Sequence, residues 1–210
     1  MKQEVQTVLE KLREAYPDAH CELDHENALE LLIATLLSAQ TTDRQVNIVT
    51  KRFFADCRCL EDFLALSEEE IRGYIRSLGF FNMKAAHLYR LFRELRDRFG
   101  GEVPASMEEL CSLPGVGRKT ANVVLSNAFG VPAIAVDTHV FRVANRLGLC
   151  RTKTPEETEK ALMEAIDRDW WSLSHHLLIF HGRRCCEAKR PRCQECPVRE
   201  HCPSRPQITD

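Results

Sequence analysis

The cysteines near the C-terminus have the type and spacing of metal ligands. Five of the ten cysteines lie between residues 185 and 202, and four follow the pattern Cys-x6-Cys-x2-Cys-x5-Cys, namely Cys186, Cys193, Cys196 and Cys202. This part of the chain is polar and contains prolines, so a hydrophobic core does not account for the thiols. The spacing suits a structural Zn²⁺ as readily as a [4Fe–4S] cluster, and His201 offers an alternative zinc ligand. Cys185 is left over as a spare thiol.

A glycine-containing turn brings together groups that suit a phosphate. It has the sequence LPGVGRKT from Leu113 to Thr120 and lies between a helix that Ser106 is expected to cap and a long apolar helix. The N–H groups of the turn and of the new helix then point at one spot, which suits an anion. No Walker-type ending follows at the required spacing, which favours a DNA backbone phosphate over a nucleotide. A plain helical hairpin without a ligand is the alternative.

Lys119 and Asp137 are the side chains that could carry catalysis. Lys119 lies in the first turn of the helix, where a cation opposes the helix dipole, so a role other than helix stability is expected. An amine at a positive helix end, partly desolvated and next to Arg118, is favoured in its neutral form, which can make a Schiff base. A phosphate contact is the alternative for both cations. Asp137 follows the apolar segment 133–136 at a helix start, where aspartate commonly serves as the N-cap.

Three stretches of the sequence resemble the endonuclease III family of DNA repair enzymes. They are LPGVGRKTANVVLSNAFG, VPAIAVDTHVFRVANRLGL and the cysteine tail, and the match extends back through ELLIATLLSAQTTD to cover nearly the whole chain. The resemblance implies a bifunctional enzyme that flips oxidised or otherwise damaged pyrimidines out of duplex DNA, removes them and nicks the abasic site by β-elimination. It also implies that Lys119 attacks the sugar C1′ and forms the Schiff base, and that Asp137 is the catalytic aspartate.

The resemblance further implies which residues contact DNA. It places a helix–hairpin–helix motif at residues 113–119, and the DNA-contacting residues of this motif would be Leu113, Gly115, Val116, Gly117 and Arg118. Gln40 would fill the gap left by the flipped base, and Phe80 would be the apolar wedge that kinks the duplex. Burial in the core is the alternative for Phe80, and Asp43 could be only a helix N-cap.

The resemblance also decides between the metals that the cysteine spacing leaves open. It implies a [4Fe–4S] cluster held by the four spaced cysteines. The loop between the first two ligands contains Lys189, Arg190 and Arg192, and a cluster that tethers this loop would hold the cations toward DNA phosphates. We therefore expect the cluster to have a structural rather than a redox role.

Helical patterns continue through the whole chain and predict an all-α fold of about nine or ten short helices. Three helix starts have the residues of a capping box: Ser67 with Glu70, Ser106 with Glu109, and Thr154 with Glu157. Gly130, Gly148 and Gly182 are expected to end helices in the left-handed conformation. The apolar segment 29–37 is expected to form the most buried helix.

The resemblance implies two helical lobes with a DNA cleft between them. The first is a helical-barrel lobe of residues 21–131, which includes the helix–hairpin–helix region at roughly 106–130. The second combines residues 1–20 with 132–210 and carries the cluster loop 186–202.

The charge is unevenly distributed although the net charge is only −2. Residues 181–205 include seven basic and three acidic residues, which favours a basic face for nucleic acid; a solvated charged surface is the alternative. The longest apolar run, residues 29–37, is far shorter than the ~20 residues of a membrane span, and the charged N-terminus lacks features of a secretory signal. We therefore expect a cytoplasmic, nucleoid-associated monomer with reduced cysteines.

Three other functions are compatible with parts of the pattern. An adenine glycosylase of the same superfamily would lack the nucleophilic lysine and would have a glutamate in the helix before Gln40, where this chain has Ala34. A non-catalytic DNA-binding module with a structural metal would need neither Lys119 nor Asp137. A metal-dependent nuclease would need clustered acids near the DNA face, which the sequence does not offer.

Overall fold

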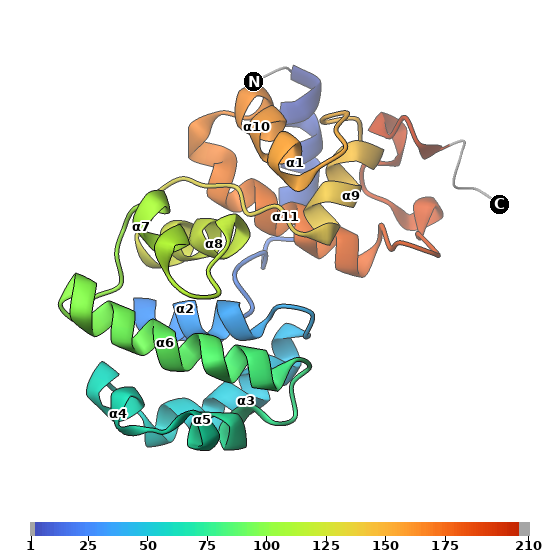
Figure 1. Cartoon of the computed structure of the whole chain (residues 1–210). Coiled ribbons are helices and arrows are strands. Elements are labelled where there is room, and N and C mark those ends of the chain that lie inside the picture. Colours follow the sequence, from blue (N-terminus) through green and yellow to red (C-terminus); the bar gives the residue numbers. More distant parts are fainter. Residues whose placement is uncertain (1–2, 206–210) are drawn as a thin grey trace. The chain divides into compact units, whose positions relative to one another are not determined.

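The computed structural model describes residues 3–205, and every regular element among them is a helix, as predicted. These residues form eleven α-helices and three 3₁₀ helices, slightly more than expected, because two of the α-helices have only six residues. The chain divides into two compact units, Glu22–Val131 and Met1–Cys21 with Pro132–Asp210 (Figure 1). No described helix is long and apolar enough to cross a membrane.

The unit Glu22–Val131 is built around its first helix. Its helices are α2 (Ala28–Leu37), α3 (Asp43–Asp56), α4 (Leu60–Ala65), α5 (Glu68–Ile75), α6 (Phe81–Phe99), α7 (Met107–Ser112) and α8 (Arg118–Ala128). α2 contacts α3, α6 and α8, and eight of its ten residues are buried. The prediction that this segment forms the most buried helix is confirmed, since its apolar residues lie on all sides of the helix.

Aromatic rings pack α3, α4 and α6 together. Phe53 lies edge-on to Phe63 with ring centroids 5.1 Å apart, and Phe63 is stacked on Phe92 at 4.9 Å. All three rings are fully buried, and such pairs contribute about 0.5–1.5 kcal/mol each beyond their buried area. α6 ends at Gly100, which has a φ of 62°. This core fixes α6 and with it the loop that precedes its first residue.

The second unit carries the N-terminal helix and the cysteine tail. It contains α1 (Gln3–Ala15), α9 (Thr138–Arg146), α10 (Pro155–Ala165), α11 (Trp171–Arg184) and the 3₁₀ helices Arg168–Trp170, Cys193–Glu195 and Arg199–His201. α11 packs against both α1 and α9, and α10 packs against α9. The apolar faces of these helices form one continuous core. The cysteine tail therefore starts from a helix that is held on two sides.

The glycines of the second unit serve two different purposes. Gly148, with a φ of 71°, ends α9 as predicted, and a Cβ there would lie 2.9 Å from Pro203 Cγ. The prediction for Gly182 is wrong, because this residue lies inside α11. A Cβ on Gly182 would lie 3.0 Å from His139 Cβ and 3.1 Å from Val143 Cγ2. Glycine at this position lets α9 and α11 approach closely.

The predicted helix starts are all capped. Ser67 Oγ accepts from the Glu70 N–H at 3.2 Å, and the Glu70 carboxylate accepts from the Ser67 N–H at 2.7 Å, which completes a capping box. The other two caps are Ser106 Oγ and Thr154 Oγ1, which accept from the N–H groups of Glu109 and Glu157, each at 3.2 Å. Caps of this kind stabilise a helix by roughly 1 kcal/mol each.

Candidate active site and cysteine cluster

The turn between α7 and α8 is held from inside the unit. Leu113 and Val116 are only 3% and 6% exposed, and the Val116 N–H donates to Leu113 O at 3.2 Å. The Leu113 N–H likewise donates to Leu110 O at 3.1 Å, so these two predicted DNA-contacting residues have buried side chains and N–H groups that are already bonded within the unit. Gly115 has a φ of 76°, and a Cβ there would lie 2.7 Å from His87 Nδ1. Both observations require glycine where the turn packs against α6.

α8 begins with two cations and no side-chain cap. Its N-cap is Gly117, with φ −98° and ψ 175°, and this residue has no side chain that could cap the helix. Arg118 and Lys119 are the first two residues of the helix; Arg118 is exposed and Lys119 is half-buried. The predicted place of Lys119 in the first turn is confirmed. Cations here oppose the helix dipole, which costs about 0.3–1 kcal/mol each, whereas an anion would be favoured.

Asp137 caps α9 with its own carboxylate. Its Oδ1 accepts from the Val140 N–H at 2.8 Å, and the residue is half-buried. The apolar segment 133–136 before it is buried and lies outside the helices. The prediction that Asp137 is an N-cap is confirmed, and the cap uses one of its two carboxylate oxygens. Lys119 belongs to the unit Glu22–Val131 and Asp137 to the other unit.

Two loops of the unit Glu22–Val131 present strained residues to solvent. Gln40 and Phe80 have φ values of 53° and 57°, the only described non-glycine residues in the left-handed region. Phe80 is 60% exposed, so it is not a core residue. A Cβ on Gly79 would lie 3.9 Å from Gln40 O, so the two loops are neighbours. Left-handed conformations of this kind cost about 1–3 kcal/mol and cluster at functional sites.

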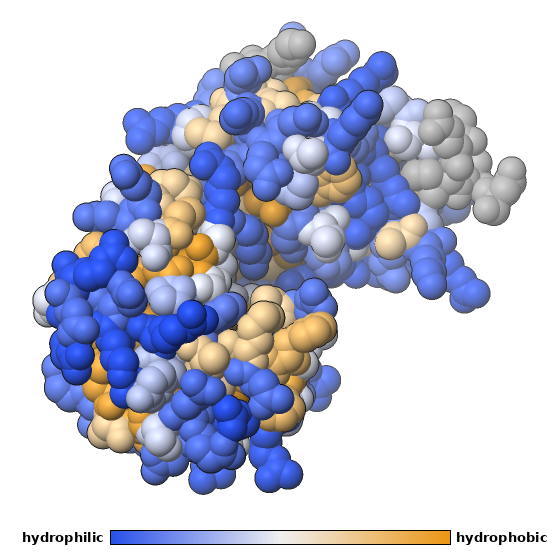
Figure 2. All heavy atoms as spheres, in the orientation of Figure 1, coloured by the Kyte–Doolittle hydropathy of each residue, from blue (hydrophilic) through white to orange (hydrophobic). Residues whose placement is uncertain are grey.

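The surface around these loops is apolar. Ile48 and Met83 are 59% and 54% exposed, close in sequence to Gln40 and Phe80 respectively. Figure 2 shows apolar side chains at the surface over α3 and the start of α6, whereas much of the rest of the visible surface is hydrophilic. Exposed apolar patches of this kind commonly mark binding surfaces.

The N-cap of α3 is Thr42, and Asp43 is the first residue of the helix. The suggestion that Asp43 is the cap is therefore wrong.

A buried lysine of α6 is hydrogen-bonded to the loop that contains Gln40. Lys84, in the first turn of α6, is 2% exposed, and its Nζ donates to Thr41 Oγ1 at 2.9 Å. Burial lowers the pKa of the Lys84 ammonium group. Gln45 Nε2, in the first turn of α3, donates to Ser77 Oγ at 3.3 Å and links α3 to the loop that contains Phe80. The conformation of Gln40 is therefore fixed by α6 as well as by its own loop.

Arginines on α9 bind backbone carbonyls at the end of α11 and in the loop that follows it. Arg142 and Arg146 are four residues apart and lie on one face of the helix. Each donates to two carbonyl oxygens at distances of 2.7 to 3.1 Å; the acceptors are Gly182 and Cys186 for Arg142, and Glu187 and Ala188 for Arg146. The helix that begins at Asp137 therefore also fixes the start of the cysteine loop.

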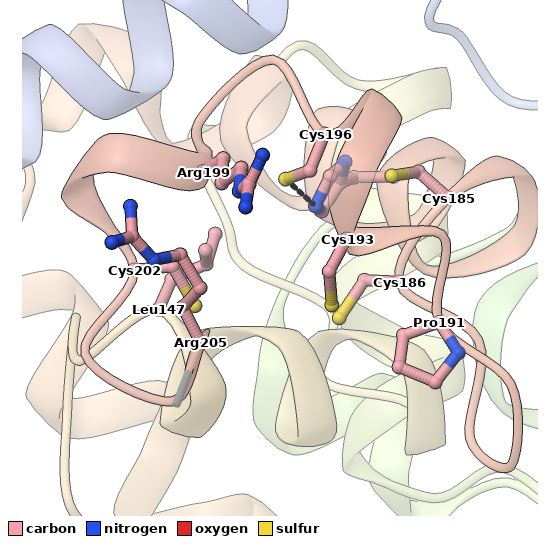
Figure 3. Close-up of a pocket in the computed structure, with 10 residues that line it drawn as sticks. Leu147, Cys185, Cys186, Pro191, Cys193, Cys196, Arg199, Cys202 and Arg205 are labelled. Atoms are coloured by element: carbon pink, nitrogen blue, oxygen red, sulfur yellow. Dashed lines mark hydrogen bonds between the residues drawn. The ribbon is translucent and has the colours of Figure 1, made fainter. Parts of the chain in front are cut away.

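The four predicted metal ligands line one pocket (Figure 3). The predicted ligands are Cys186, Cys193, Cys196 and Cys202. Cys185 and His181, which the prediction did not include as ligands, line the same pocket. The sulfur atoms of Cys186 and Cys193 point toward each other, whereas Cys196 points toward His181, with Sγ and Nε2 3.7 Å apart. Cys202 Sγ lies 3.4 Å from Arg146 O.

The residues of this pocket fit a metal cofactor. Cysteine sulfurs are the donors that iron–sulfur clusters and structural zinc use. Arg199 lines the same pocket, and its buried Nε has no hydrogen-bond partner in the part of the chain that the structure describes. A buried N–H group without a hydrogen-bond partner is costly, and a metal-bound thiolate would be an acceptor for it. Burial raises the pKa of the Cys193 and Cys202 thiols, so metal uptake would release protons.

The basic loop between Cys186 and Cys193 is exposed. Lys189, Arg190 and Arg192 all face solvent. The loop is closed by the Arg192 N–H, which donates to Cys185 O at 2.9 Å. Arg192 Nη1 lies 3.9 Å from a carboxylate oxygen of Glu195, and an exposed pair at that distance contributes little. The three cations are therefore available to a polyanion.

Several structurally important residues have no role in the sequence prediction. Lys84 is missed because lysine in a helix is normally solvated, and only its tertiary neighbours make it a support. Arg142 and Arg146 could have been found from their four-residue spacing after Asp137. His181 and Cys185 have the same spacing across the end of α11, which places two ligand-type side chains on one helical face.

The comparisons with known proteins agree with this geometry. Residues 33–168 match the family described as HhH-GPD superfamily base excision DNA repair protein. The endonuclease III of Bacillus subtilis is 50% identical over 95% of this chain and 91% of its own length. The chain belongs to the endonuclease III family. A solved structure of a trapped endonuclease III–DNA covalent intermediate superposes with a TM-score of 0.95 at 49% identity, covering 100% of this chain and 99% of that one.

Membership of the endonuclease III family establishes the activity of this chain. The chain is a DNA base excision repair enzyme, a bifunctional DNA glycosylase and abasic-site lyase. A non-covalent endonuclease III–DNA complex superposes with a TM-score of 0.94 at 50% identity, covering 99% of this chain and 97% of that one. The helix–hairpin–helix expected from the glycine turn is therefore part of a fold that this family shares, and the cysteine pocket is compatible with a metal cofactor.

Proposed function

We propose that this enzyme removes oxidised and otherwise damaged pyrimidines from duplex DNA through Lys119 and then nicks the abasic site. The observation that carries the proposal is the start of α8, where an uncapped helix end follows the hairpin turn and bears Arg118 and Lys119. Helix stability alone would favour acids at these positions. The N–H groups and Arg118 suit a DNA phosphate, and a half-buried amine beside that phosphate is placed for attack on the adjoining sugar.

The proposed reaction begins with the Lys119 amine. Its nitrogen forms a bond to the sugar C1′, the glycosidic bond breaks, and the base leaves with the bonding electrons. The bond between C1′ and the ring oxygen then breaks as the nitrogen lone pair forms an imine with C1′, and the proton lost by nitrogen passes to the ring oxygen. Loss of a 2′ proton and departure of the 3′ phosphate complete the β-elimination. We assign to Asp137 the stabilisation of the positive charge that develops on the sugar as the base leaves.

The two compact units would be the lobes that hold the DNA. We propose that the turn formed by Leu113, Gly115, Val116 and Gly117 binds phosphate together with Arg118, with Leu113 and Val116 holding the turn in place through their internal hydrogen bonds. Gln40 would fill the space of the flipped base, and Phe80 would enter the base stack. The left-handed backbone and the exposure of both residues support this role. An endonuclease III that is 49% identical to this chain was solved as a trapped covalent intermediate with DNA, which supports the covalent route.

We propose that the metal cofactor is a [4Fe–4S] cluster held by Cys186, Cys193, Cys196 and Cys202. Such a cluster would supply a rigid anchor rather than a reactive centre, since the chemistry assigned to Lys119 needs no electron transfer. The anchored loop would direct Lys189, Arg190 and Arg192 toward phosphates. The enzyme would act on chromosomal DNA in the cytoplasm, as a monomer.

Borohydride trapping on a duplex with one oxidised pyrimidine tests the proposal. Because borohydride reduces an imine to a stable amine, the wild-type enzyme should become covalently linked to the DNA. Lys119→Gln should bind the same duplex and give no linked product. Lys160→Gln, which changes an exposed lysine on α10, is the matched control and should be trapped like the wild type. Trapping of Lys119→Gln at the wild-type level would overturn the assignment.

A further inference from the structure

Three ligand-type side chains meet beside the four spaced cysteines. His181, Cys185 and Cys196 each present a donor atom, and the three atoms all lie within 4.8 Å of one another. His181 and Cys185 are four residues apart across the end of α11, and Cys196 comes from the tail. The dashed line from Cys196 in Figure 3 marks its contact with His181 Nε2 at 3.7 Å. One metal ion could therefore contact all three without movement of the main chain.

The histidine of this group is oriented as metal-binding histidines are. His181 is fully buried, and its Nδ1 lies 3.0 Å from Tyr16 Oη. In the tautomer that protonates Nδ1, this nitrogen donates to the tyrosine oxygen and the lone pair of Nε2 faces Cys196. Metal-binding histidines typically donate their second ring N–H to an oxygen in this way, which fixes the ring and its tautomer.

Cys185 is held at this site by its own neighbours. It is 6% exposed, and its N–H donates to His181 O at 3.0 Å. Its Sγ lies 3.5 Å from Arg192 O, and its carbonyl accepts from the Arg192 N–H at 2.9 Å. The thiol therefore lies at a fixed point between α11 and the basic loop. This position places the thiol beside His181 and Cys196.

We propose that His181, Cys185 and Cys196 form a second metal site, which binds one zinc ion when the four-cysteine cluster is not assembled. Two thiolates and one imidazole are preferred zinc donors, and three protein ligands leave a fourth, tetrahedral position for water. Cys196 belongs to both sets, so zinc at this site and the proposed iron–sulfur cluster exclude each other. This exclusion rests on the proposed cluster ligands, whereas the zinc site itself depends only on the three residues.

Zinc X-ray absorption of the full chain tests the proposal. Protein produced in iron-poor, zinc-supplemented medium should hold about one zinc per chain, coordinated by two sulfurs and two lighter atoms, one of them imidazole nitrogen. In Cys185→Ser, this mixed spectrum should be lost, with zinc either absent or bound by sulfur of the remaining cysteines. The matched control is Cys150→Ser, a buried thiol of the same unit, which should keep the wild-type spectrum. Zinc bound by four sulfurs in the wild type, unchanged in Cys185→Ser, would overturn the proposal.

A cobalt titration separates the zinc site from the cluster ligands. A chain with Cys186, Cys193 and Cys202 all changed to serine should still bind about one Co²⁺ with the visible spectrum of a tetrahedral thiolate site. Adding Cys185→Ser should abolish that spectrum, and a spectrum that persists would contradict the proposal. If the triple variant does not fold, the X-ray absorption of the single variants decides alone. Iron content after growth in iron-rich medium should be the same in Cys185→Ser and the wild type; a loss of iron would assign Cys185 to the cluster instead.

Discussion

The two helices that carry the proposed catalytic residues begin in opposite ways. α8 starts at Gly117, which has no side chain to cap the helix, and continues with two cations. α9 starts at Asp137, whose carboxylate accepts a backbone N–H and caps the helix from within. The first arrangement leaves the positive helix end to a ligand, and the second occupies it with a side chain of the protein.

This difference separates the contributions of the two residues to folding and to catalysis. Lys119 makes α8 less stable, so its removal should change the reaction and leave stability equal or slightly higher. Asp137 stabilises α9, so only a substitution that keeps the cap can isolate its role in the reaction. The helix end that is uncapped is the one expected to bind DNA. The helix that Asp137 caps also holds the cysteine loop, through Arg142 and Arg146 further along its length.

Asp137→Asn, at the N-cap of α9, should have the largest effect on activity. Asparagine is as good an N-cap as aspartate, so α9 and the melting temperature should change little. Loss of the charge should lower base excision by about a hundred- to a thousand-fold, the usual loss when one stabilising electrostatic partner is removed. The measurement is single-turnover excision on a duplex with one oxidised pyrimidine, compared with cleavage of a pre-formed abasic site, which should be less affected because its glycosidic bond is already broken.

Asp137→Ala is the companion variant for this prediction. It removes both the charge and the cap, so it should lose excision to a similar extent and also lose about 0.5–2 kcal/mol of stability. If Asp137→Asn excised bases at nearly the wild-type rate while Asp137→Ala only melted earlier, Asp137 would be a cap and nothing more.

Cys193→Ser should give the next largest effect. Removing one ligand should reduce iron from about four atoms per chain to near zero, since all four thiolates hold the cluster. The loop that α9 supports through Arg142 and Arg146 would then lose its other anchor, and affinity for damaged and undamaged duplexes alike should fall about ten-fold. Metal analysis and fluorescence anisotropy measure the two effects. Full iron together with full affinity in this variant would remove Cys193 from the ligand set.

The positions of Lys119 and Asp137 on their helices could be predicted because local sequence determines them. A glycine turn and an apolar segment before an aspartate fix helix starts within a few residues. The prediction that Gly182 ends a helix is wrong for the converse reason. Glycine at this position lets α9 approach α11, and only tertiary packing imposes this requirement. Likewise, no local pattern separates the buried Lys84 from a solvated helical lysine. The meeting of His181 with Cys196 depends on how the tail folds back, which spacing does not fix.

Changing Arg190 and Arg192 to alanine should have a smaller effect than the loss of a cluster ligand. Each exposed guanidinium is expected to contact one phosphate, so each change should lower the slope of log affinity against log salt by roughly one. Damaged and undamaged duplexes should lose affinity equally, because phosphate contacts carry no information about the base. Binding titrations at several salt concentrations test this. A loss confined to one lesion would assign the affected arginine to the base pocket.

Gly117→Asn should have the smallest effect, and it tests the uncapped side of the comparison. The backbone at Gly117 is extended, and a Cβ there would meet nothing within 4 Å, so asparagine fits and can cap α8. Stability should rise by only about a few tenths of a kcal/mol, since glycine is itself a tolerable N-cap. DNA affinity should fall a few-fold, because the new side chain takes the N–H groups that a phosphate would use. Cys59→Ser changes the N-cap of α4, away from the proposed DNA contacts, and should leave DNA affinity unchanged. If Gly117→Asn stabilised the protein and bound DNA as tightly as the wild type, the start of α8 would not be the phosphate site.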